Sequence, residues 1–329
     1  MKKTYFITGG TGSFAKKFIK LLINKKLAKK IIVFSRDEYK QLMMQELPFV
    51  KSNLNIFRFY IGDVRDKNRL EWAIQDTVDV VVHSAALKQV PATEYNPFET
   101  VQTNIIGTQN LIEICINKNI NKVILISTDK AVSPINLYGS TKLTAEKLFI
   151  SANIFKGLKK TKFSVIRYGN VMGSRGSVIP IFLNQNKSLT SPFTVTDKNM
   201  TRFNISLTEA ANFVNMCILK MNGSEVFIPK IPSYKILDLV KAINPEKKIK
   251  FIGIRPGEKI HEELIEASDS NKIIESKNYF IINFSQKPRL KKTISKYKNF
   301  NSYNSLENSE FLSIAQIRKE IKKNIEDFD

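Results

Sequence analysis

Five side chains that could perform acid–base chemistry lie close together in the middle of the sequence. After an apolar run that ends near Ile126, the chain sets out Thr128, Asp129, Lys130, Tyr138 and Lys142. Nothing after Tyr138 breaks a helix, so Tyr138 and Lys142, at positions i and i+4, should share one helix face. An ammonium beside a phenol favours the phenolate, so this pair could act as a base near neutral pH.

The same residues also have an ordinary interpretation. A chain with this composition should contain about one Tyr-x-x-x-Lys by chance, and a surface tyrosine near a surface lysine is then the alternative. Asp129 and Lys130 could likewise be charges in a solvated turn. The elements that precede and follow this stretch decide between the two interpretations.

A glycine-rich turn near the start of the chain is the first such element. A β-rich run from Thr4 to Thr8 precedes it, and apolar residues from Phe14 to Leu22 follow at helical spacing. Strand, glycine turn and helix form the context in which a pyrophosphate binds a helix N-terminus; a bare turn is the alternative. The candidate cofactor-binding residues here are Gly9, Thr11, Gly12, Ser13 and Phe14.

The tip of the second strand bears on the type of dinucleotide. The run of residues 30–34 ends at Ser35 and Arg36. An acid at this tip usually binds the ribose 2′-hydroxyl of NAD, whereas an arginine accommodates a 2′-phosphate, so the sequence favours NADP. A solvated loop charge is the alternative for Arg36. Candidate cofactor contacts after later strands are Asp63, Val64 and Ala86, together with Tyr138 and Lys142.

Six strand-like runs alternate with helical patterns up to about residue 170. They cover residues 4–8, 30–34, 56–61, 78–82, 123–126 and 163–167. This alternation predicts an α/β fold, a Rossmann-like doubly wound parallel sheet with helices on both faces. Ligands bind at the carboxyl ends of such strands, where Thr128, Tyr138 and Asn170 should meet. His83, at the end of one strand, is expected to be a structural, hydrogen-bonded spacer.

The alternation of strand-like and helical patterns ends near residue 170, and beyond it prolines divide the chain into short elements. We expect an NADP-binding domain over residues 1–170, a smaller mixed substrate domain over 171–278 and a C-terminal tail over 279–329. Helices are predicted over 207–219, returning to the sheet, and over 261–267, after a turn at residues 255–259. A final amphipathic helix should contain Phe311, Ile314 and Ile317.

The composition argues against membrane, secreted, metal-binding and nucleic-acid-binding proteins. No run approaches 18 apolar residues, so no membrane span is expected, and the start lacks the apolar stretch of a secretion signal. Cys115 and Cys217 lie far apart and fit a reducing cytoplasm, and with 2 histidines a metal centre is not expected. The net charge of +22 is spread without clustered arginine. We therefore expect no nucleic-acid partner, and a field that attracts a diphosphate substrate.

Taken together, these motifs resemble the extended short-chain dehydrogenase/reductases, and most closely the inverting UDP-N-acetylglucosamine 4,6-dehydratases that begin pseudaminic acid synthesis. Lys130 is the most discriminating residue, because the pattern of retaining sugar dehydratases has an acid there. Ala15 in place of a glycine and Asn204 in place of an aromatic residue depart from the family pattern, and Asn204 bears on the fit of the sugar. The resembling segments are TGGTGSF (8–14), FSRDEYKQ (34–41), STDKAVSPINLYGSTK (127–142), RYGNVMGSRGSVIP (167–180) and RPGEKIHEELI (255–265).

The resemblance implies a cytoplasmic homo-oligomer that uses NADP and a UDP-sugar substrate. Tyr138, assisted by Lys142, would take the O4 proton while C4 gives hydride to NADP, and Thr128 would hold O4. Asp129 or Lys130 would act at C5, Lys130 with a pKa lowered by a partly dry site, and Asp129 would assist loss of the C6 hydroxyl. Arg255 would grip phosphate and Glu258 ribose; the implied substrate-binding residues are Lys88, Asn170, Arg202, Arg255 and Glu258.

Three other functions compete with this one. A nucleotide-sugar C4 epimerase or reductase of the same fold would use Tyr138 and Lys142 but has no evident need for Lys130. A dinucleotide-sensing protein without catalysis would need neither residue of the Tyr138–Lys142 pair. A basic nucleic-acid binder would have to retain DNA affinity at physiological salt.

Overall fold

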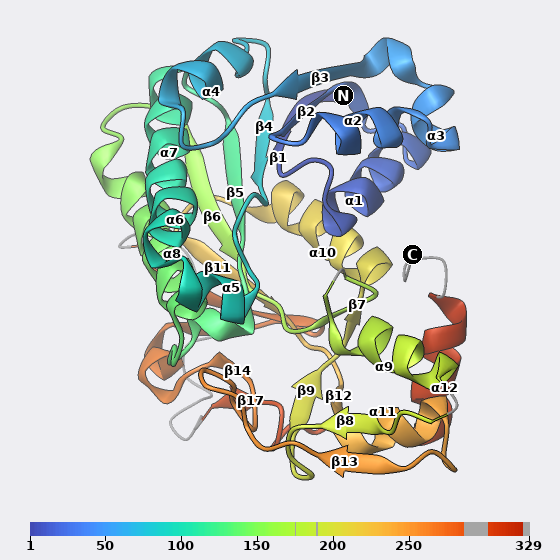
Figure 1. Ribbon diagram of the computed structural model, residues 1–329. Helices are drawn as coiled ribbons and strands as arrows, with labels where there is room; N and C mark the ends of the chain where they lie inside the picture. Colours follow the sequence, from blue (N-terminus) through green and yellow to red (C-terminus); the bar gives the residue numbers. More distant parts are fainter. Residues whose placement is uncertain (175, 189, 286–301, 325–329) are drawn as a thin grey trace.

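Short β-branched and aromatic runs form the strands of one large sheet. The computed structural model describes residues 1–174, 176–188, 190–285 and 302–324, and within these ranges nine strands are ordered β15-β16-β11-β6-β5-β4-β1-β2-β3 (Figure 1). Seven of them are parallel: β1 (Lys3–Thr8), β2 (Ala28–Ser35), β3 (Phe57–Ile61), β4 (Val80–His83), β5 (Lys122–Ile126), β6 (Lys162–Ile166) and β11 (Glu225–Pro229). The antiparallel pair β15 (Ile273–Glu275) and β16 (Tyr279–Asn283) extends the β11 edge.

Helices cover both faces of this sheet, because each parallel crossover must pass over one face. On one face α1 (Ser13–Asn24) packs beside α10 (Leu207–Lys220), and on the other α7 (Gly107–Asn117) lies between α4 (Lys67–Ala73) and α8 (Leu137–Phe155) (Figure 1). Shorter helices are α2 (Glu38–Gln45), α3 (Pro48–Lys51), α5 (Val90–Tyr95) and α6 (Pro97–Val101). The predicted doubly wound parallel sheet is therefore confirmed.

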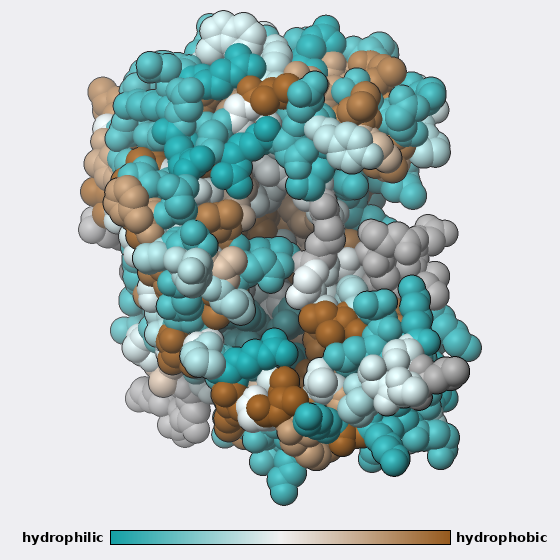
Figure 2. Space-filling view, viewed as in Figure 1, coloured by the Kyte–Doolittle hydropathy of each residue, from teal (hydrophilic) through white to brown (hydrophobic). Residues whose placement is uncertain are grey.

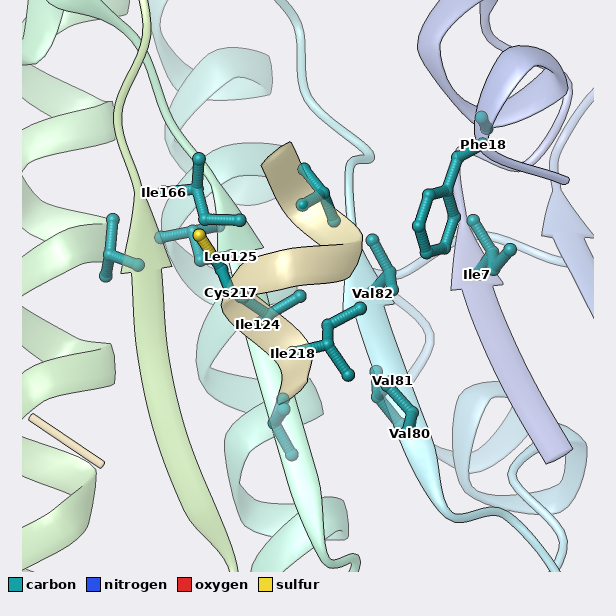
Figure 3. Close-up of a cluster of buried hydrophobic side chains, with 14 of the residues drawn as sticks. Ile7, Phe18, Val80, Val81, Val82, Ile124, Leu125, Ile166, Cys217 and Ile218 are labelled. Carbon is teal, nitrogen blue, oxygen red and sulfur yellow. The ribbon is translucent and has the colours of Figure 1, made fainter. Parts of the chain in front are cut away.

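The main hydrophobic core lies between α1, α10 and the central strands. Cys217 and Ile218 of α10 lie over strands β4 and β5, while Phe18 of α1 lies beside Ile7 of β1 (Figure 3). Ala15, which stands where a third glycine is usual, is 1% exposed in this core, so its methyl group fits where helix α1 packs on the sheet.

A smaller set of elements follows β6 and encloses a second hydrophobic cluster. Its members include Phe182, Phe193, Leu239 and Ile317. The elements are β7 (Val171–Met172), α9 (Val178–Lys187), β8 (Phe193–Val195), β9 (Thr201–Phe203), β10 (Ile205–Ser206), β12 (Ser233–Lys235), α11 (Ile236–Ile243), β13 (Ile249–Phe251), β14 (Glu263–Ile265), β17 (Tyr303–Asn304) and α12 (Ile314–Lys323).

Of the predicted helices in this half, one is confirmed and one is wrong. The helix expected over 207–219 is α10, which a capping box between Ser206 and Glu209 begins and which packs on α1. The helix expected over 261–267 is absent from the described chain, since Glu263–Ile265 is strand β14, paired with β17. That pairing comes from a distant segment, and local periodicity carries no sign of it.

The C-terminal segment returns to the body of the protein. Helix α12 begins after Ser313, which caps it, so Ile314 and Ile317 lie in the predicted helix but Phe311 lies before it, bridged to Ser233. Within the predicted tail, β16 belongs to the large sheet, and residues 286–301 and 325–329 lie outside the described residues. Among the described helices, none is both long enough and apolar enough for a membrane crossing.

Candidate active site

A cavity of about 580 Å³ lies at the carboxyl ends of the parallel strands. It opens where the molecule is hollowed between the large sheet and the smaller set of elements (Figure 2), on a face that is mostly hydrophilic. Most of the predicted site residues line it: Gly9, Thr11, Gly12, Ser13, Phe14, Ser35, Arg36, Asp63, Val64, Ala86, Lys88, Thr128, Asp129, Lys130, Tyr138, Lys142 and Asn170.

The glycine turn after β1 has the shape of a phosphate cradle. Gly9 has φ +62°, and a Cβ there would lie 2.9 Å from the backbone nitrogen of Ala85, so only glycine lets the turn pass this close to the neighbouring loop. Gly12 stands at the N-cap of α1 without a side-chain cap, which leaves the first helical amides facing the cavity. These features fit the pyrophosphate of a dinucleotide.

Cationic groups gather where β2 ends. Arg36 is half exposed and lies 3.5 Å from Asp63, measured from Nη1 to Oδ2. The carboxylate of Asp37 is engaged as the N-cap of α2, where it accepts from the Lys40 amide at 2.9 Å, and it also pairs with the Lys40 ammonium. Burial raises the pKa of Asp63, but its bonds with Arg65 outweigh this and hold the pKa below its usual value.

The stretch that follows β5 forms the opposite wall. Residues Asp129–Ala131 make one tight helical turn, and Asn136 then caps α8 by accepting from the Gly139 amide at 2.8 Å. A Cβ on Gly139 would lie 2.1 Å from the Lys130 carbonyl oxygen. The glycine therefore lets the start of α8 pack directly against the turn, which brings Tyr138 and Lys130 to the same wall.

Tyr138 and Lys142 are both buried on the same face of α8. The Lys142 ammonium donates to the Ile126 carbonyl at 2.8 Å, and burial lowers its pKa to about 8. Burial raises the pKa of Tyr138 to about 12, against the lowering effects of the Lys130 charge and of a hydrogen bond with Thr128. Burial therefore opposes the phenolate, and Lys142 donates to a carbonyl and not to Tyr138; a base at Tyr138 near neutral pH stays a prediction.

Two buried carboxylates flank Lys130. Its Nζ lies 3.0 Å from Asp129 Oδ1 and 3.2 Å from Glu262 Oε1. Burial disfavours the charge on Lys130, but the two carboxylates outweigh it and raise its pKa. The expectation that a partly dry site lowers the pKa of Lys130 is therefore wrong, because the same site also holds the carboxylates of Asp129 and Glu262. Burial raises the pKa of Asp129.

Glu262 is the residue that sequence reasoning missed. It lies within the segment 255–265, among several other charged residues, and its contact with Lys130 spans the large sheet and the smaller set of elements. No spacing signal distinguishes it from the neighbouring Glu263, which is partly exposed and accepts a hydrogen bond from Ser133.

Among the described residues, four buried oxygens of the cavity lining lack a hydrogen-bond partner, and Thr103 Oγ1 and Ser177 Oγ are two of them. Asn170 Oδ1 and Asp129 Oδ2 are the other two, and such groups are costly to bury unpaired. A bound ligand with hydroxyl or amide donors would satisfy both oxygens. The site therefore suits a polar ligand beside the nucleotide cradle.

Three predicted substrate-binding residues lie outside the lining of this cavity. Arg202 is buried and donates to the carbonyls of Thr201, Lys259 and Ile260, so protein groups already occupy its guanidinium. Glu258 lies 3.6 Å from Arg202, and Arg255 is exposed. Three backbone carbonyls take donors of Arg202, and its direct contact with substrate stays a prediction.

His83 has the structural role expected of it. Its two ring nitrogens lie 2.7 Å from Thr8 Oγ1 and 3.1 Å from Thr108 Oγ1, and its side chain is fully enclosed. Burial lowers its pKa to about 3. The ring therefore links β1, β4 and α7 as a neutral spacer.

Comparison with known proteins places the chain among nucleotide-sugar enzymes. The profile of the polysaccharide biosynthesis protein family matches residues 5–284. A UDP-N-acetylglucosamine 4,6-dehydratase (inverting) of Campylobacter jejuni is 50% identical over 280 residues, 85% of this chain and 82% of the relative. A UDP-glucose 4-epimerase of Rickettsia bellii is 43% identical over 288 residues, 85% of this chain and 82% of the relative.

Similarity to a solved structure extends over nearly the whole chain. The X-ray structure of Pen from Bacillus thuringiensis is 40% identical in sequence, with a TM-score of 0.89, and the match covers 98% of each chain. The family profile, the relatives and the nucleotide cradle agree with the resemblance carried by the sequence motifs. The chain belongs to the polysaccharide biosynthesis protein family.

Proposed function

We propose that this protein is a C5-inverting UDP-N-acetylglucosamine 4,6-dehydratase that uses NADP. The observation that carries the proposal is the ion pair between buried Asp129 and partly buried Lys130, 3.0 Å apart, on the same cavity wall as Tyr138. An enzyme that only exchanges hydride at C4 needs a tyrosine but no second acid–base pair. The identity of 50% to a dehydratase of this name supports the same assignment.

The reaction removes one water and leaves the cofactor unchanged. The glycine turn after β1 and Arg36 would hold NADP, which would supply the hydride chemistry for oxidation at C4 and reduction at C6. Between these events the C5 proton and the C6 hydroxyl leave as water, and a proton returns to the opposite face of C5. The product is UDP-2-acetamido-2,6-dideoxy-β-L-arabino-hex-4-ulose, and the acquired 4-keto group is what makes the C5 proton acidic.

The side chains divide this work by position. Tyr138 would take the O4 proton once its phenol has lost its own, with Thr128 as hydrogen-bond partner beside it, and the Lys142 ammonium on the same helix face would stabilise the phenolate. Lys130 would take the C5 proton once it has lost its own, and Asp129 would protonate the departing C6 hydroxyl. The raised pKa of Asp129 suits an acid.

The preference for NADP rests on the charges at the end of β2. The Arg36 guanidinium is half exposed at the cavity rim, and Asp37 is occupied as a helix cap. An arginine at this position can bind a 2′-phosphate, whereas the Asp37 carboxylate is turned to the cap of α2 and to Lys40. Arg36→Ala should weaken NADP binding more than NAD binding, as measured by titration calorimetry with both dinucleotides.

The decisive experiment is incubation of the purified protein with UDP-N-acetylglucosamine in D₂O, followed by NMR. We expect a C6 methyl group, a 4-keto group, and deuterium at C5 with inverted configuration. An unchanged C6 hydroxymethyl group would contradict the proposal, and a C4 epimer alone would support the epimerase alternative that some relatives' names suggest. The Lys130→Ala variant should still oxidise C4 and stall before elimination.

The proposed function also includes substrate contacts outside the acid–base residues, an oligomeric state and a cellular location. Lys88 and Asn170 line the cavity and would contact the UDP-sugar, and Arg255 and Glu258 would approach it from the neighbouring loop. We propose a cytoplasmic homo-oligomer that begins pseudaminic acid synthesis. Sedimentation of the purified protein would test the assembly, and the configuration at C5 of the NMR product would test the pathway.

A further inference from the structure

Glu262 has a buried carboxylate beside Lys130, and the reaction proposed above assigns this carboxylate no role. It is 3% exposed, and its Oε1 lies 3.2 Å from Lys130 Nζ and 3.6 Å from Arg202 Nε. Its Oε2 is buried and has no hydrogen-bond partner among the described residues. A charge buried to this degree must be paired, and here its partner is the lysine assigned to C5.

A residue from the C-terminal segment fixes the backbone of Glu262. The Glu262 amide donates to Ser305 Oγ at 2.9 Å, and the Ser305 amide donates to the Glu262 carbonyl at 2.8 Å. Ser305 Oγ also lies 2.7 Å from Thr201 Oγ1. Ser305 is fully buried and lies beyond residues 5–284, which match the family profile.

We propose that Glu262, held in place by Ser305, is a positioning residue for the Asp129–Lys130 pair: it is the counter-ion of Lys130 and so leaves Asp129 free to keep a proton. This inference rests on the proposed dehydratase function and deepens it. With Glu262 ionised, Lys130 has its negative partner without Asp129. Asp129 then remains available as the acid that the C6 hydroxyl requires.

The charges on the three groups agree with this division. Burial raises the pKa of Glu262, but Lys130 and Arg202 outweigh it and lower the pKa. Burial raises the pKa of Asp129, and the charge of Glu262 adds to that rise. Of the two carboxylates, Glu262 is therefore the one that carries the charge.

The same contact gives Lys130 a place to leave its proton. Before Lys130 can accept the C5 proton, one of its N–H bonds must break. Glu262 Oε1, at 3.2 Å, lies within reach to form the new O–H bond. The proton moves from nitrogen to oxygen without leaving the site. Lys130 and Glu262 become neutral together, so their opposing effects on the pKa of Asp129 disappear as a pair and Asp129 keeps its proton for the C6 hydroxyl.

The other charged and titratable groups around Lys130 are few among the described residues. Arg202 faces it from β9, Tyr138 from α8 and Tyr234 from β12. Arg202 lowers the pKa of Lys130, and both tyrosines remain neutral because burial raises the pKa of each to about 12. Removal of the Glu262 charge should therefore lower the pKa of both Lys130 and Asp129.

The first test needs no turnover. In the ligand-free protein, the rate at which acetic anhydride modifies Lys130 is measured against pH by peptide mass spectrometry. Glu262→Gln should move the half-reactivity of Lys130 to lower pH by about one unit or more, as expected when a buried counter-ion is lost. Glu263→Gln, which removes a neighbouring charge that does not contact Lys130, is the matched control and should leave it unchanged.

The second test separates the steps of the reaction. In a single turnover, Glu262→Gln should form reduced cofactor at close to the normal rate but release C6-methyl product about 100-fold more slowly, within the range of acid–base contributions. The ascending and descending limbs of its pH–rate profile should both move to lower pH. A loss of rate with unmoved limbs would mean that Glu262 only supports the fold, and it would overturn the proposal.

Ser305→Ala tests the contribution of the C-terminal segment. It should move the Lys130 half-reactivity in the same direction as Glu262→Gln, but by less. Ser313→Ala, which removes the cap of α12 without touching Glu262, controls for general loosening of the segment. An unmoved Lys130 in Ser305→Ala would remove Ser305 from the proposal, and an unmoved Lys130 in Glu262→Gln would refute it whether or not the protein proves to be a dehydratase.

Discussion

Burial governs the chemistry of the individual side chains in this site. Tyr138, Lys142, Asp129 and Glu262 are each below 10% exposed, so every charge among them depends on a named neighbour. Lys130 keeps its charge because two carboxylates lie within 3.2 Å. Lys142 donates to the Ile126 carbonyl, and burial lowers its pKa to about 8 against the raising effect of the Glu146 carboxylate.

Tyr138→Phe removes one hydroxyl and keeps the shape of the residue. We expect oxidation at C4 to slow by about 100-fold or more, because general-base catalysis at O4 is lost. Single-turnover absorbance of the reduced nicotinamide measures this step. Tyr279→Phe is the control, because it removes a hydroxyl on β16 that accepts from the Lys220 ammonium of α10. An equal loss in both variants would contradict a role for Tyr138 at O4.

His83 should make the stability of the protein depend on pH. Its folded pKa of about 3 lies below the ordinary 6.5, so the neutral ring stabilises the fold fully above pH 6.5, and this contribution is lost as pH falls toward 3. Between pH 7 and pH 5 the free energy of unfolding should fall by about 2 kcal/mol from this residue. Urea titrations at the two pH values should show a smaller fall for His83→Asn than for the unsubstituted protein.

At the scale of elements, two turns with the same backbone angle carry different constraints. Gly9 and Gly157 have φ +62° and +60°, but a Cβ on Gly9 would meet the loop after β4, whereas one on Gly157 would meet open space. Gly157 only ends α8 in the left-handed conformation that glycine favours. Gly9 must in addition leave room beside the nucleotide cradle.

These two glycines allow a matched comparison. Gly157→Ala should cost about 1–2 kcal/mol of stability, the ordinary penalty for a left-handed alanine. Gly9→Ala should cost more, because the methyl group also meets the backbone of Ala85, and it should abolish dinucleotide binding measured by calorimetry. Normal binding by Gly9→Ala would mean that the turn does not approach the cofactor.

Elements that depend on nearby residues can be predicted from this sequence, whereas elements that depend on distant pairing cannot. The strands before Gly9, Arg36 and Thr128 follow from short apolar runs, and their carboxyl ends meet because parallel strands must align them. Strand β14 depends on its pairing with β17, so the segment around Glu263 was expected to be helical. The same non-local packing places Glu262 beside Lys130 and turns Arg202 toward backbone carbonyls.

At the scale of the whole molecule, the two hydrophobic clusters do not correspond to two consecutive parts of the sequence. The main cluster draws on β1 through β6 and again on α10, β11 and β16, whereas the second holds α9, α11 and α12. The prolines predict short elements beyond residue 170, and the helix predicted over 207–219 was expected to return to the sheet, whereas the further return through β11 and β16 was not predicted. The return brings the C-terminal segment against Glu262.

Helix α12 should therefore contribute to the stability of the protein by packing on the second hydrophobic cluster. Ile317 is 1% exposed among apolar residues of that cluster, and Ile317→Ala should lower the free energy of unfolding by about 2–5 kcal/mol. Ile154→Ala, on a helix surface where the side chain is 71% exposed, should change it by less than about 0.5 kcal/mol. Denaturant titration of both variants measures the difference; equal effects would show that α12 does not pack on the cluster in solution.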